Sequence, residues 1–411
     1  MEKLRILIYS SDSSGLGYTS RAVWIASHIA EHIENTSMLL LTDLPIANRL
    51  KFPEHVDYIH LPGILSKNDE TYVTRRLNID LQHTMMLRHK ITKSTIKTFK
   101  PRLIIIESDP AVLPREMKNT FGFVKKRFPE TKIIWGMPDT VGEPEKIIRR
   151  WKEKDVYTIL DQVCDEIWVH GAKSIFDFAT EYQLPKTLAN RVIYTGYIRA
   201  PYVTRHRIHK DKTKLRLKKP FVLVTAGSGN NGFALIDNYL RFLEHSGEAL
   251  PFRSVIVTGP MMKSQEKHIL LDRAENLPNV IFHRYSKHIL QYLKYAQLVV
   301  CHGGFNLLCE ILTYRKNAIF VPNLSATNEY LYRSQLFKTL GLVELILPNK
   351  LSPDIIGEKV ASAFSKEFNS ELFDSVDISQ DGLRNIIERV KFLNSKVAFE
   401  IRHTAAKASL S

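Results

Sequence analysis

Four segments of the sequence combine glycines with polar side chains, and each one follows a short apolar run. Residues 10–21 read SSDSSGLGYTSR, residues 225–232 read TAGSGNNG, residues 302–310 read HGGFNLLCE, and residues 321–335 read VPNLSATNEYLYRSQ. Glycines let a backbone approach a ligand closely, and free N–H groups at the start of a helix attract anions. The pattern therefore predicts a site for a phosphate-bearing or hydroxyl-rich ligand.

The first segment is a loop in which Gly15 and Gly17 precede a predicted helix. Ser20 stands where the dinucleotide fingerprint G-x-G-x-x-G requires its third glycine. The loop is therefore either a ligand-binding turn or a plain connection from strand to helix.

The second segment completes that fingerprint with Gly227, Gly229 and Gly232 around Ser228. A nicotinamide or flavin site also needs an acid at the end of the next strand, but that strand ends in Thr258 and a glycine. The G-x-S-x-G elbow of hydrolases is excluded, because alanine and asparagine occupy its glycine positions. We expect a phosphate-binding loop and no cofactor.

The third segment places Gly303 and Gly304 at the start of a helix, directly after His302. Asn306 and Glu310 lie one turn apart on that helix and share a face. A carboxylate there can accept two hydrogen bonds from a vicinal diol such as a ribose. The alternative is a solvated acid on a polar helix face.

The fourth segment carries Glu329 and Gln335 on a polar loop and the helix that follows it. Polar side chains in this position suit sugar hydroxyls. A simple capped helix explains the same residues equally well.

Short apolar runs alternate with longer amphipathic stretches along both halves of the chain, which predicts parallel α/β sheets. The predicted strands cover residues 5–10, 37–42, 103–107, 132–135 and 166–169, then 221–225, 254–258, 280–283, 298–301 and 318–321. We expect two doubly wound, Rossmann-like domains that face each other, with ligands at the carboxyl ends of the strands. The predicted boundaries are 1–200, a basic connector at 201–219, 220–375, and a C-terminal helix and tail at 376–411 that packs across the domain junction.

The composition narrows the class of protein and of partner. The chain has 411 residues, with 58 Lys and Arg against 43 acids, a net charge of +15 and a pI near 9.5. This excess suggests an anionic partner. Nucleic acid is not expected, because the basic residues are dispersed and no reader motif is present.

The three cysteines, Cys164, Cys301 and Cys309, form no disulfide framework, so we expect a cytoplasmic protein. Cys301, His302 and Cys309 have no fourth ligand at a suitable spacing, so no metal site is expected. The sequence shows neither a signal peptide nor an apolar run long enough to span a bilayer. We therefore expect a soluble protein whose membrane contact, if present, is peripheral.

Residues 71–100 combine basic and apolar side chains, and we expect a helix there. The set is Arg75, Arg76, Arg88, Lys90, Lys93, Lys97 and Lys100 with Leu81, Met85, Met86, Leu87 and Ile91. Such a helix either docks on anionic lipid at the inner membrane face or is a core helix with a solvated basic face.

Together these segments resemble the GT-B glycosyltransferases, and most closely the predicted transferases related to the enzyme that adds N-acetylglucosamine in lipid II synthesis. Four further segments fit the same group, namely LPGILSKND, GMPDTVGEPEKIIRRW, DEIWVHG and TGYIRAP. The resemblance therefore extends from about residue 4 to residue 347. It implies an inverting, metal-independent transfer of a hexose or N-acetylhexosamine from a nucleotide diphosphate sugar, with a UDP-sugar favoured. The acceptor would be a hydroxyl of a small molecule, a glycan or a lipid-linked sugar.

The resemblance also implies roles for individual residues. Glu310 would hold the nucleotide ribose, and Glu329 and Gln335 would face the donor sugar. The diphosphate would meet the glycine loops and an arginine, namely Gly15, Gly17, Gly227, Ser228, Gly229, His302, Gly303, Gly304, Asn306 and Arg199. The nucleobase of the donor would border residues 283–286, which include His283 and Tyr285.

The acceptor hydroxyl needs a general base, and here the sequence departs from the family pattern. Relatives often carry histidine where this chain has Tyr18, and neutral tyrosine, with a usual pKa near 10, accepts protons poorly. The remaining candidates are Asp12, Asp109 and Asp139, which follow strands of the first domain; we favour Asp109.

Two other functions fit the same pattern. A non-hydrolysing UDP-sugar 2-epimerase shares the architecture and forms product without an acceptor. A catalytically silent relative that binds a nucleotide sugar is the other alternative, because Tyr18 replaces the expected histidine.

Overall fold

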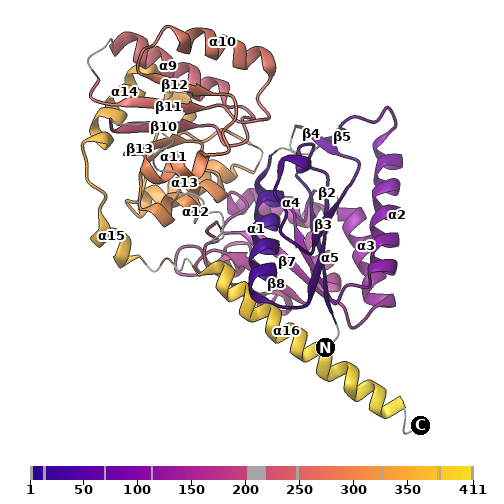
Figure 1. Ribbon diagram of the computed structural model, residues 1–411. Coiled ribbons are helices and arrows are strands. Elements are labelled where there is room, and N and C mark those ends of the chain that lie inside the picture. Colours follow the sequence, from indigo (N-terminus) through magenta and orange to yellow (C-terminus); the bar gives the residue numbers. More distant parts are fainter. Residues whose placement is uncertain are drawn as a thin grey trace. The chain divides into compact units, whose positions relative to one another are not determined.

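A computed structural model of the protein describes residues 3–12, 15–68, 71–112, 114–200, 219–246, 250–325, 327–376, 378 and 381–408. The chain divides into two compact units. The first contains Met1–Ile198 with Asp381–Ser411, and the second contains Arg199–Gln380. Each unit is built on a parallel sheet with helices packed on its faces (Figure 1). The predicted connector at 201–219 lies outside the described residues except for its last one.

The sheet of the first unit has seven parallel strands in the order β3-β2-β1-β6-β7-β8-β9. They are β1 (Leu4–Ser10), β2 (Thr36–Thr42), β3 (Val56–His60), β6 (Leu103–Glu107), β7 (Lys132–Pro138), β8 (Glu166–His170) and β9 (Val192–Tyr194). The strand order reverses between β1 and β6, and such a switch point is where doubly wound sheets bind ligands.

Helices cover both faces of this sheet because successive residues of a strand point to opposite sides. Ile6 and Ile8 belong to a buried cluster formed with α1 (Gly17–His32) and α16 (Gly382–Ala408). Tyr9 points the other way and packs edge-on against Phe121 of α3 (Pro114–Arg127), with ring centroids 5.8 Å apart. The other helices are α2 (Leu81–Phe99), α4 (Pro144–Glu153), α5 (Val156–Val163), α6 (Phe178–Glu181) and α7 (Lys186–Ala189), with a 3-10 turn at Ala47–Arg49.

The C-terminal helix α16 belongs to the first unit. Arg389 forms an ion pair with Glu166 at the start of β8, and the Asn385 side chain donates to the Thr195 carbonyl at 2.7 Å. The chain thus leaves the first unit after Ile198 and returns to it at Asp381.

The sheet of the second unit has six parallel strands in the order β12-β11-β10-β13-β14-β15. They are β10 (Phe221–Thr225), β11 (Arg253–Val257), β12 (Val280–His283), β13 (Leu298–Cys301), β14 (Asn317–Phe320) and β15 (Glu344–Leu345). The helices are α9 (Phe233–Ser246), α10 (Ser264–Glu275), α11 (Ile289–Tyr295), α12 (Phe305–Tyr314), α13 (Glu329–Thr339), α14 (Pro353–Phe364) and α15 (Ser370–Ser375), with a 3-10 turn at Pro348–Lys350. The predicted pair of doubly wound parallel sheets is confirmed.

The prediction of one helix over residues 71–100 was wrong at its start. Thr71–Thr74 forms β5, which pairs antiparallel with β4 (Ile64–Asn68). The β-branched and aromatic residues of this stretch favour a strand. Helix α2 begins at Leu81, where the Asp80 carboxylate accepts a hydrogen bond from the His83 N–H at 2.8 Å.

Gly136, in the middle of β7, has no room for a side chain. A Cβ there would overlap the Glu107 carboxylate and lie 2.9 Å from Nε2 of His170. Gly122, inside α3, is the opposite case, because a Cβ there meets nothing within 4 Å.

We predict that Gly136→Ala destabilises the first unit by about 1–3 kcal/mol or more, as overpacking does. Gly122→Ala should stabilise it by up to about 1 kcal/mol, because alanine favours a helix. All four tryptophans lie in the first unit, so urea unfolding followed by their fluorescence reports this unit alone. Equal midpoints for the two variants would contradict the packing described for β7.

Candidate functional site

The predicted ligand residues of the second unit lie at the carboxyl edge of its sheet. The strand order reverses between β10 and β13, and these strands lead into the second and third glycine segments. The loop after β11 and the loop after β12 follow on one side, and the segment after β14 lies on the other. The structure therefore brings most of the predicted donor residues to one edge around a switch point.

The glycines of the loop after β10 serve mainly to pack two loops together. Gly229 has a φ of +98°, and a Cβ there would lie 2.7 Å from the Thr258 carbonyl oxygen. A Cβ on Gly259, after β11, would lie 2.6 Å from the Gly229 nitrogen. Gly227, with a φ of +64°, faces open space instead. Of this loop, Gly227 and the neighbouring Ser228 are therefore the part that a ligand can approach.

The start of α12 is shaped by α13. Gly303 has a φ of +76°, and its Cβ would lie 2.9 Å from the Ser334 hydroxyl. A Cβ on Gly304 would lie 2.9 Å from the ring of Tyr330. Both glycines are thus required by packing, and they bring the first turn of α12 up to α13. The N-cap residue Gly304 makes no side-chain capping bond to the helix.

His302 is buried beside this helix start and holds a fixed orientation. Its Nδ1–H donates to the Val321 carbonyl at 2.6 Å. Burial lowers the pKa of His302 below its usual value, so the ring is neutral at pH 7. A neutral imidazole adds a polar atom next to the helix start without adding charge.

Glu310 is only 1% exposed, which contradicts the alternative of a solvated acid. Its Oε1 accepts a hydrogen bond from the Ala200 N–H at 2.5 Å. The two partners are 110 residues apart in the sequence, and the bond places the exposed Arg199, one residue before Ala200, near α12. A carboxylate can accept about four hydrogen bonds, among them bonds from the hydroxyls of a diol. Asn306, one turn before Glu310, is partly buried.

The two predicted sugar-facing residues on α13 are not equivalent. Glu329 forms an ion pair at 2.9 Å with Arg333, which is fully buried and lies over the ring of Phe305. Gln335 is exposed and lies about 120° around the helix from Glu329. The structure therefore does not bring Glu329 and Gln335 to one face.

In the segment 283–286, which was predicted to border the nucleobase, His283 makes hydrogen bonds within the second unit. The His283 carbonyl accepts from the Thr258 N–H at 3.1 Å, and its Nε2 lies 2.9 Å from the Tyr292 hydroxyl. Burial, and secondly His288, lower the pKa of His283. Tyr285, by contrast, is 51% exposed.

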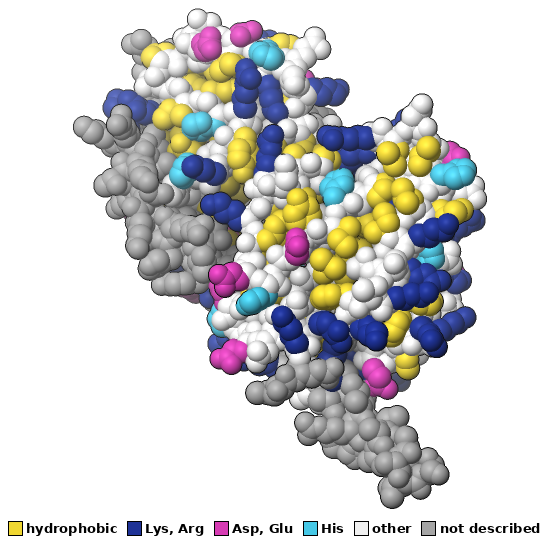
Figure 2. Space-filling model, turned by 45° about the vertical axis from the view of Figure 1, so that its right-hand side comes forward, with side chains coloured by type: hydrophobic (Ala, Val, Ile, Leu, Met, Phe, Trp, Pro, Cys, Tyr) yellow, Lys and Arg dark blue, Asp and Glu magenta, His cyan; other side chains and the backbone are white. Residues whose placement is uncertain are grey.

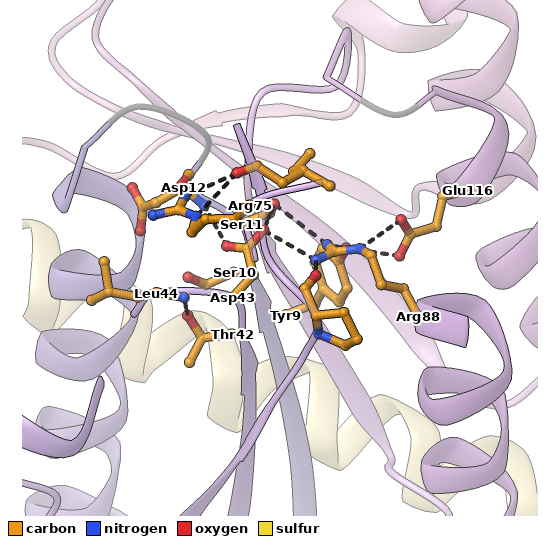
Figure 3. A network of polar contacts seen from close by, with 12 residues as sticks. Tyr9, Ser10, Ser11, Asp12, Thr42, Asp43, Leu44, Arg75, Arg88 and Glu116 are labelled. Carbon is orange, nitrogen blue, oxygen red and sulfur yellow. Dashed lines mark hydrogen bonds and ion pairs between the residues drawn. The ribbon is translucent and has the colours of Figure 1, made fainter. Parts of the chain in front are cut away.

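In the first unit, the predicted anion-binding turn after β1 is filled by the chain's own carboxylate. Asp12 accepts hydrogen bonds from the N–H groups of Tyr18 and Thr19, at 3.0 and 2.8 Å, and so caps α1. Asp43, after β2, accepts in turn from the Asp12 N–H at 3.0 Å (Figure 3). Burial raises the pKa of Asp12 against the lowering by these bonds. A phosphate bound at Gly15 and Gly17 is therefore disfavoured.

Two arginines balance the acids at this edge. Arg75 donates from Nη2 to the Asp12 carbonyl at 2.9 Å. Arg88 is fully buried and contacts Asp43 at 3.1 Å and Glu116 at 3.0 Å, while donating to the Tyr9 hydroxyl at 2.6 Å (Figure 3). Arg75 and Arg88, which we had grouped with a solvated basic face, point into the unit instead.

A second buried ion pair lies at the carboxyl end of β6. Arg21 of α1 donates to Glu107 at 2.6 Å, and Nε2 of His170 lies 3.1 Å from the other Glu107 oxygen. Burial alone raises the pKa of Glu107, but Arg21 and His170 outweigh it and lower this pKa. The same guanidinium lies 4.9 Å from the centre of the Tyr18 ring. Arg21 thereby links Tyr18 to the end of β6.

The favoured base, Asp109, is held by contacts to both of its oxygens. Its Oδ2 lies 2.6 Å from Nη1 of Arg150, and its Oδ1 accepts from the Ala111 N–H at 2.8 Å. Asp139 accepts from its neighbour Thr140 at 2.7 Å. It does not cap α4, whose N-cap residue is Glu143. Asp109 is 18% exposed at its side chain, whereas Asp12 and Asp139 are each 3% exposed.

Comparison with known proteins finds a family model and several relatives that match part of the chain. Residues 215–390 match the glycosyltransferase family 28 C-terminal domain. The chain is 33% identical over 96 residues to a UDP-N-acetylglucosamine--N-acetylmuramyl-(pentapeptide) pyrophosphoryl-undecaprenol N-acetylglucosamine transferase of Sulfurihydrogenibium sp. (strain YO3AOP1), over 23% of this chain and 28% of that enzyme. The enzyme of the same name from Streptococcus equi subsp. equi (strain 4047) is 26% identical over 210 residues, over 46% of this chain and 57% of the enzyme. The chain thus matches between about a quarter and just over half of these relatives' lengths.

Solved structures share the fold over nearly the whole chain. MurG of Acinetobacter baumannii has a TM-score of 0.57 at 11% identity, covering 94% of this chain and 99% of that one. The calicheamicin glycosyltransferase CalG4 has a TM-score of 0.60 at 15% identity, covering 97% and 98%. The UDP-GlcNAc 2-epimerase of Neisseria meningitidis has a TM-score of 0.61 at 14% identity, covering 96% and 100%.

At these identities the structural likeness establishes the fold alone. Residues 215–390 are similar to the glycosyltransferase family 28 C-terminal domain, and the chain as a whole has the GT-B fold and resembles the MurG glycosyltransferases.

Proposed function

We propose that the protein is an inverting, metal-independent glycosyltransferase that uses a UDP-sugar as donor. The observation that carries the proposal is the match of residues 215–390 to the family 28 domain, because this range contains the α12 helix start and Glu310. A 2-epimerase shares the fold, but the domain match and the curated relatives favour transfer over epimerisation.

The chemistry of the second unit suits a departing nucleotide diphosphate. Sugar transfer leaves negative charge on the diphosphate, and backbone N–H groups at a helix start stabilise that charge. In this proposal the diphosphate meets the first turn of α12 after Gly303 and Gly304, with Arg199 nearby. Glu310 binds the ribose, and Gly227 and Ser228 contribute further backbone groups. We assign Glu329 to the donor sugar and Gln335 to a more distant position.

The first unit would bind the acceptor. At its carboxyl edge the partly exposed carboxylate of Asp109 can accept a hydrogen bond from a hydroxyl group. The relatives named above act on a pyrophosphoryl-undecaprenol substrate, and we propose a lipid-linked acceptor for this chain too. We retain Asp109 as the general base, positioned by Arg150, because Asp109 is the most exposed of the three candidate carboxylates.

A lipid-linked acceptor requires contact with a membrane surface. No described helix is long and apolar enough to cross a bilayer. Large apolar side chains are nevertheless exposed on α2 and on the segment that precedes it, namely Leu77, Ile79, Met86 and Leu87, each between 41% and 46% exposed. Figure 2 shows hydrophobic and basic side chains side by side on this unit. We propose that this surface, with the exposed Lys90, Lys97 and Lys100, contacts anionic lipid.

The donor site is tested by a thermal-shift panel of nucleotide diphosphates and nucleotide sugars. At about 100-fold excess over the dissociation constant, a true ligand stabilises the protein by about 2.7 kcal/mol. We expect UDP and a UDP-sugar to raise the unfolding temperature of the wild type and of Glu358→Ala, an exposed acid of α14. Glu310→Ala and Glu310→Gln should lose most of the shift. The absence of a shift with uridine, guanosine and thymidine diphosphates would refute the donor assignment.

The base is tested by turnover. Asp109→Asn should lower kcat at least ~10²-fold, because the amide cannot accept the proton. Arg150→Lys keeps a cation beside Asp109 and should retain more activity than Arg150→Gln. Unchanged kcat in a folded Asp109→Asn protein would remove Asp109 from this role.

Membrane contact is tested by flotation with vesicles that contain anionic lipid. We expect salt-sensitive binding of the wild type and of Ile269→Glu, which changes an exposed apolar residue of α10. Met86→Glu/Leu87→Glu should abolish it, because two new charges would enter the apolar interface. If the double variant floats as well as the wild type, this surface is not the membrane contact.

A further inference from the structure

The last turn of α1 carries three metal-binding side chains that the proposed transfer reaction does not use. His28, Glu31 and His32 occupy positions i, i+3 and i+4, which places them on one helix face. One ligand atom from each residue lies within 4.8 Å of the other two. Small movements of these partly exposed side chains would bring the three atoms around a single ion.

The two imidazoles are already held near each other. Nδ1 of His32 donates to the His28 carbonyl at 2.9 Å, so the lone pair of the neutral ring resides on Nε2. The ring centroids of His28 and His32 are 4.1 Å apart. Nδ1 of His28 lies 3.9 Å from an oxygen of Glu31. This arrangement reduces the entropy that binding must remove, because two of the three ligands are oriented before an ion arrives.

The local field also favours a cation. Helix α1 ends at His32, and the C-terminal end of a helix carries partial negative charge. His32 is the basic residue of this last turn, and Glu31 supplies a full negative charge.

This turn lies at the opposite edge of the first unit's sheet from the candidate bases. In a parallel sheet, the helix after β1 starts at the carboxyl edge and ends at the amino edge. His28 lies ten residues after Tyr18, which corresponds to about 15 Å along the helix axis. An ion bound here would therefore not contact the candidate bases of the first unit.

We propose that His28, Glu31 and His32 form a surface site for a divalent d-block metal ion such as Zn²⁺. Two imidazoles and one carboxylate are donors that Zn²⁺ prefers, whereas Mg²⁺ and Ca²⁺ take oxygen ligands. Water completes the coordination. The ion joins side chains within the final turn of α1 and so stabilises the end of that helix.

The site is tested on the full-length, tag-free protein by titration with Zn²⁺ against a chromogenic chelator. The matched control is His268→Gln on α10, where Nδ1 makes the same type of bond, to the Ser264 carbonyl at 2.8 Å, but no second histidine lies one turn away. We expect one equivalent of Zn²⁺ to bind the wild type and His268→Gln with the same affinity. Binding should weaken at least about tenfold in His28→Gln/His32→Gln and in Glu31→Gln.

A second measurement separates this site from scattered surface histidines. Zn²⁺ should raise the unfolding temperature of the first unit, followed by tryptophan fluorescence, in the wild type but not in His28→Gln/His32→Gln. Mg²⁺ should have no such effect. Absence of Zn²⁺ binding to the wild type, or equal binding to the double variant, would overturn the proposal.

Discussion

The stability of the first unit depends on ion pairs that neutralise the carboxylates buried at the carboxyl edge of its sheet. Asp43 and Glu107 are fully buried, and each would cost several kcal/mol if left without a partner. Arg88 and Arg21 supply the opposite charges, also from fully or almost fully buried positions. Because Arg21 belongs to α1 and Arg88 to α2, these ion pairs fix the helices on both sides of the switch point between β1 and β6. The side chains around Glu107 are closely packed, because even a Cβ on the neighbouring Gly136 would overlap its carboxylate.

The carboxyl edges of the two sheets have equivalent positions in the topology, but they differ in how their charged groups and helix starts are satisfied. At the edge of the first unit, Asp12 caps α1 and arginines pair with the acids, so the chain itself satisfies the charged groups. At the edge of the second unit, α12 starts after Gly303 and Gly304 without a side-chain cap. In the proposed function, the second unit is therefore the one that binds the diphosphate. This asymmetry supports the division into an acceptor side and a donor side.

The sequence correctly predicted the helices and strands that depend on a local pattern of residue types. Buried strands such as β1 and β6 are continuous apolar runs, and their order along the chain implied parallel sheets. The glycine segments were also placed correctly at strand ends. The helix over 71–100 was overextended, because periodicity in its basic residues hid a short strand and the cap at Asp80.

The contacts that decide the candidate site are long-range and left no local signal. Arg88 looks like one more basic residue of an amphipathic helix, but its partners Asp43 and Glu116 lie 45 and 28 residues away. The bond between Glu310 and Ala200 spans 110 residues. Arg333 was also missed, although its pair with Glu329 is local and the i,i+4 spacing was visible in the sequence. Asp43 stands directly after an apolar run, so its position at a strand end was the one usable signal.

The central claim is that the chain transfers a sugar from a UDP-sugar to a lipid-linked hydroxyl. It is tested most directly by incubating the full chain with a UDP-N-acetylglucosamine labelled in the sugar, with and without an extract of lipid-linked acceptors. The account predicts labelled lipid and one released UDP for each sugar transferred when the extract is present, and unchanged donor when it is absent. Formation of an epimerised UDP-sugar without acceptor, or no change of the donor in either mixture, would contradict it.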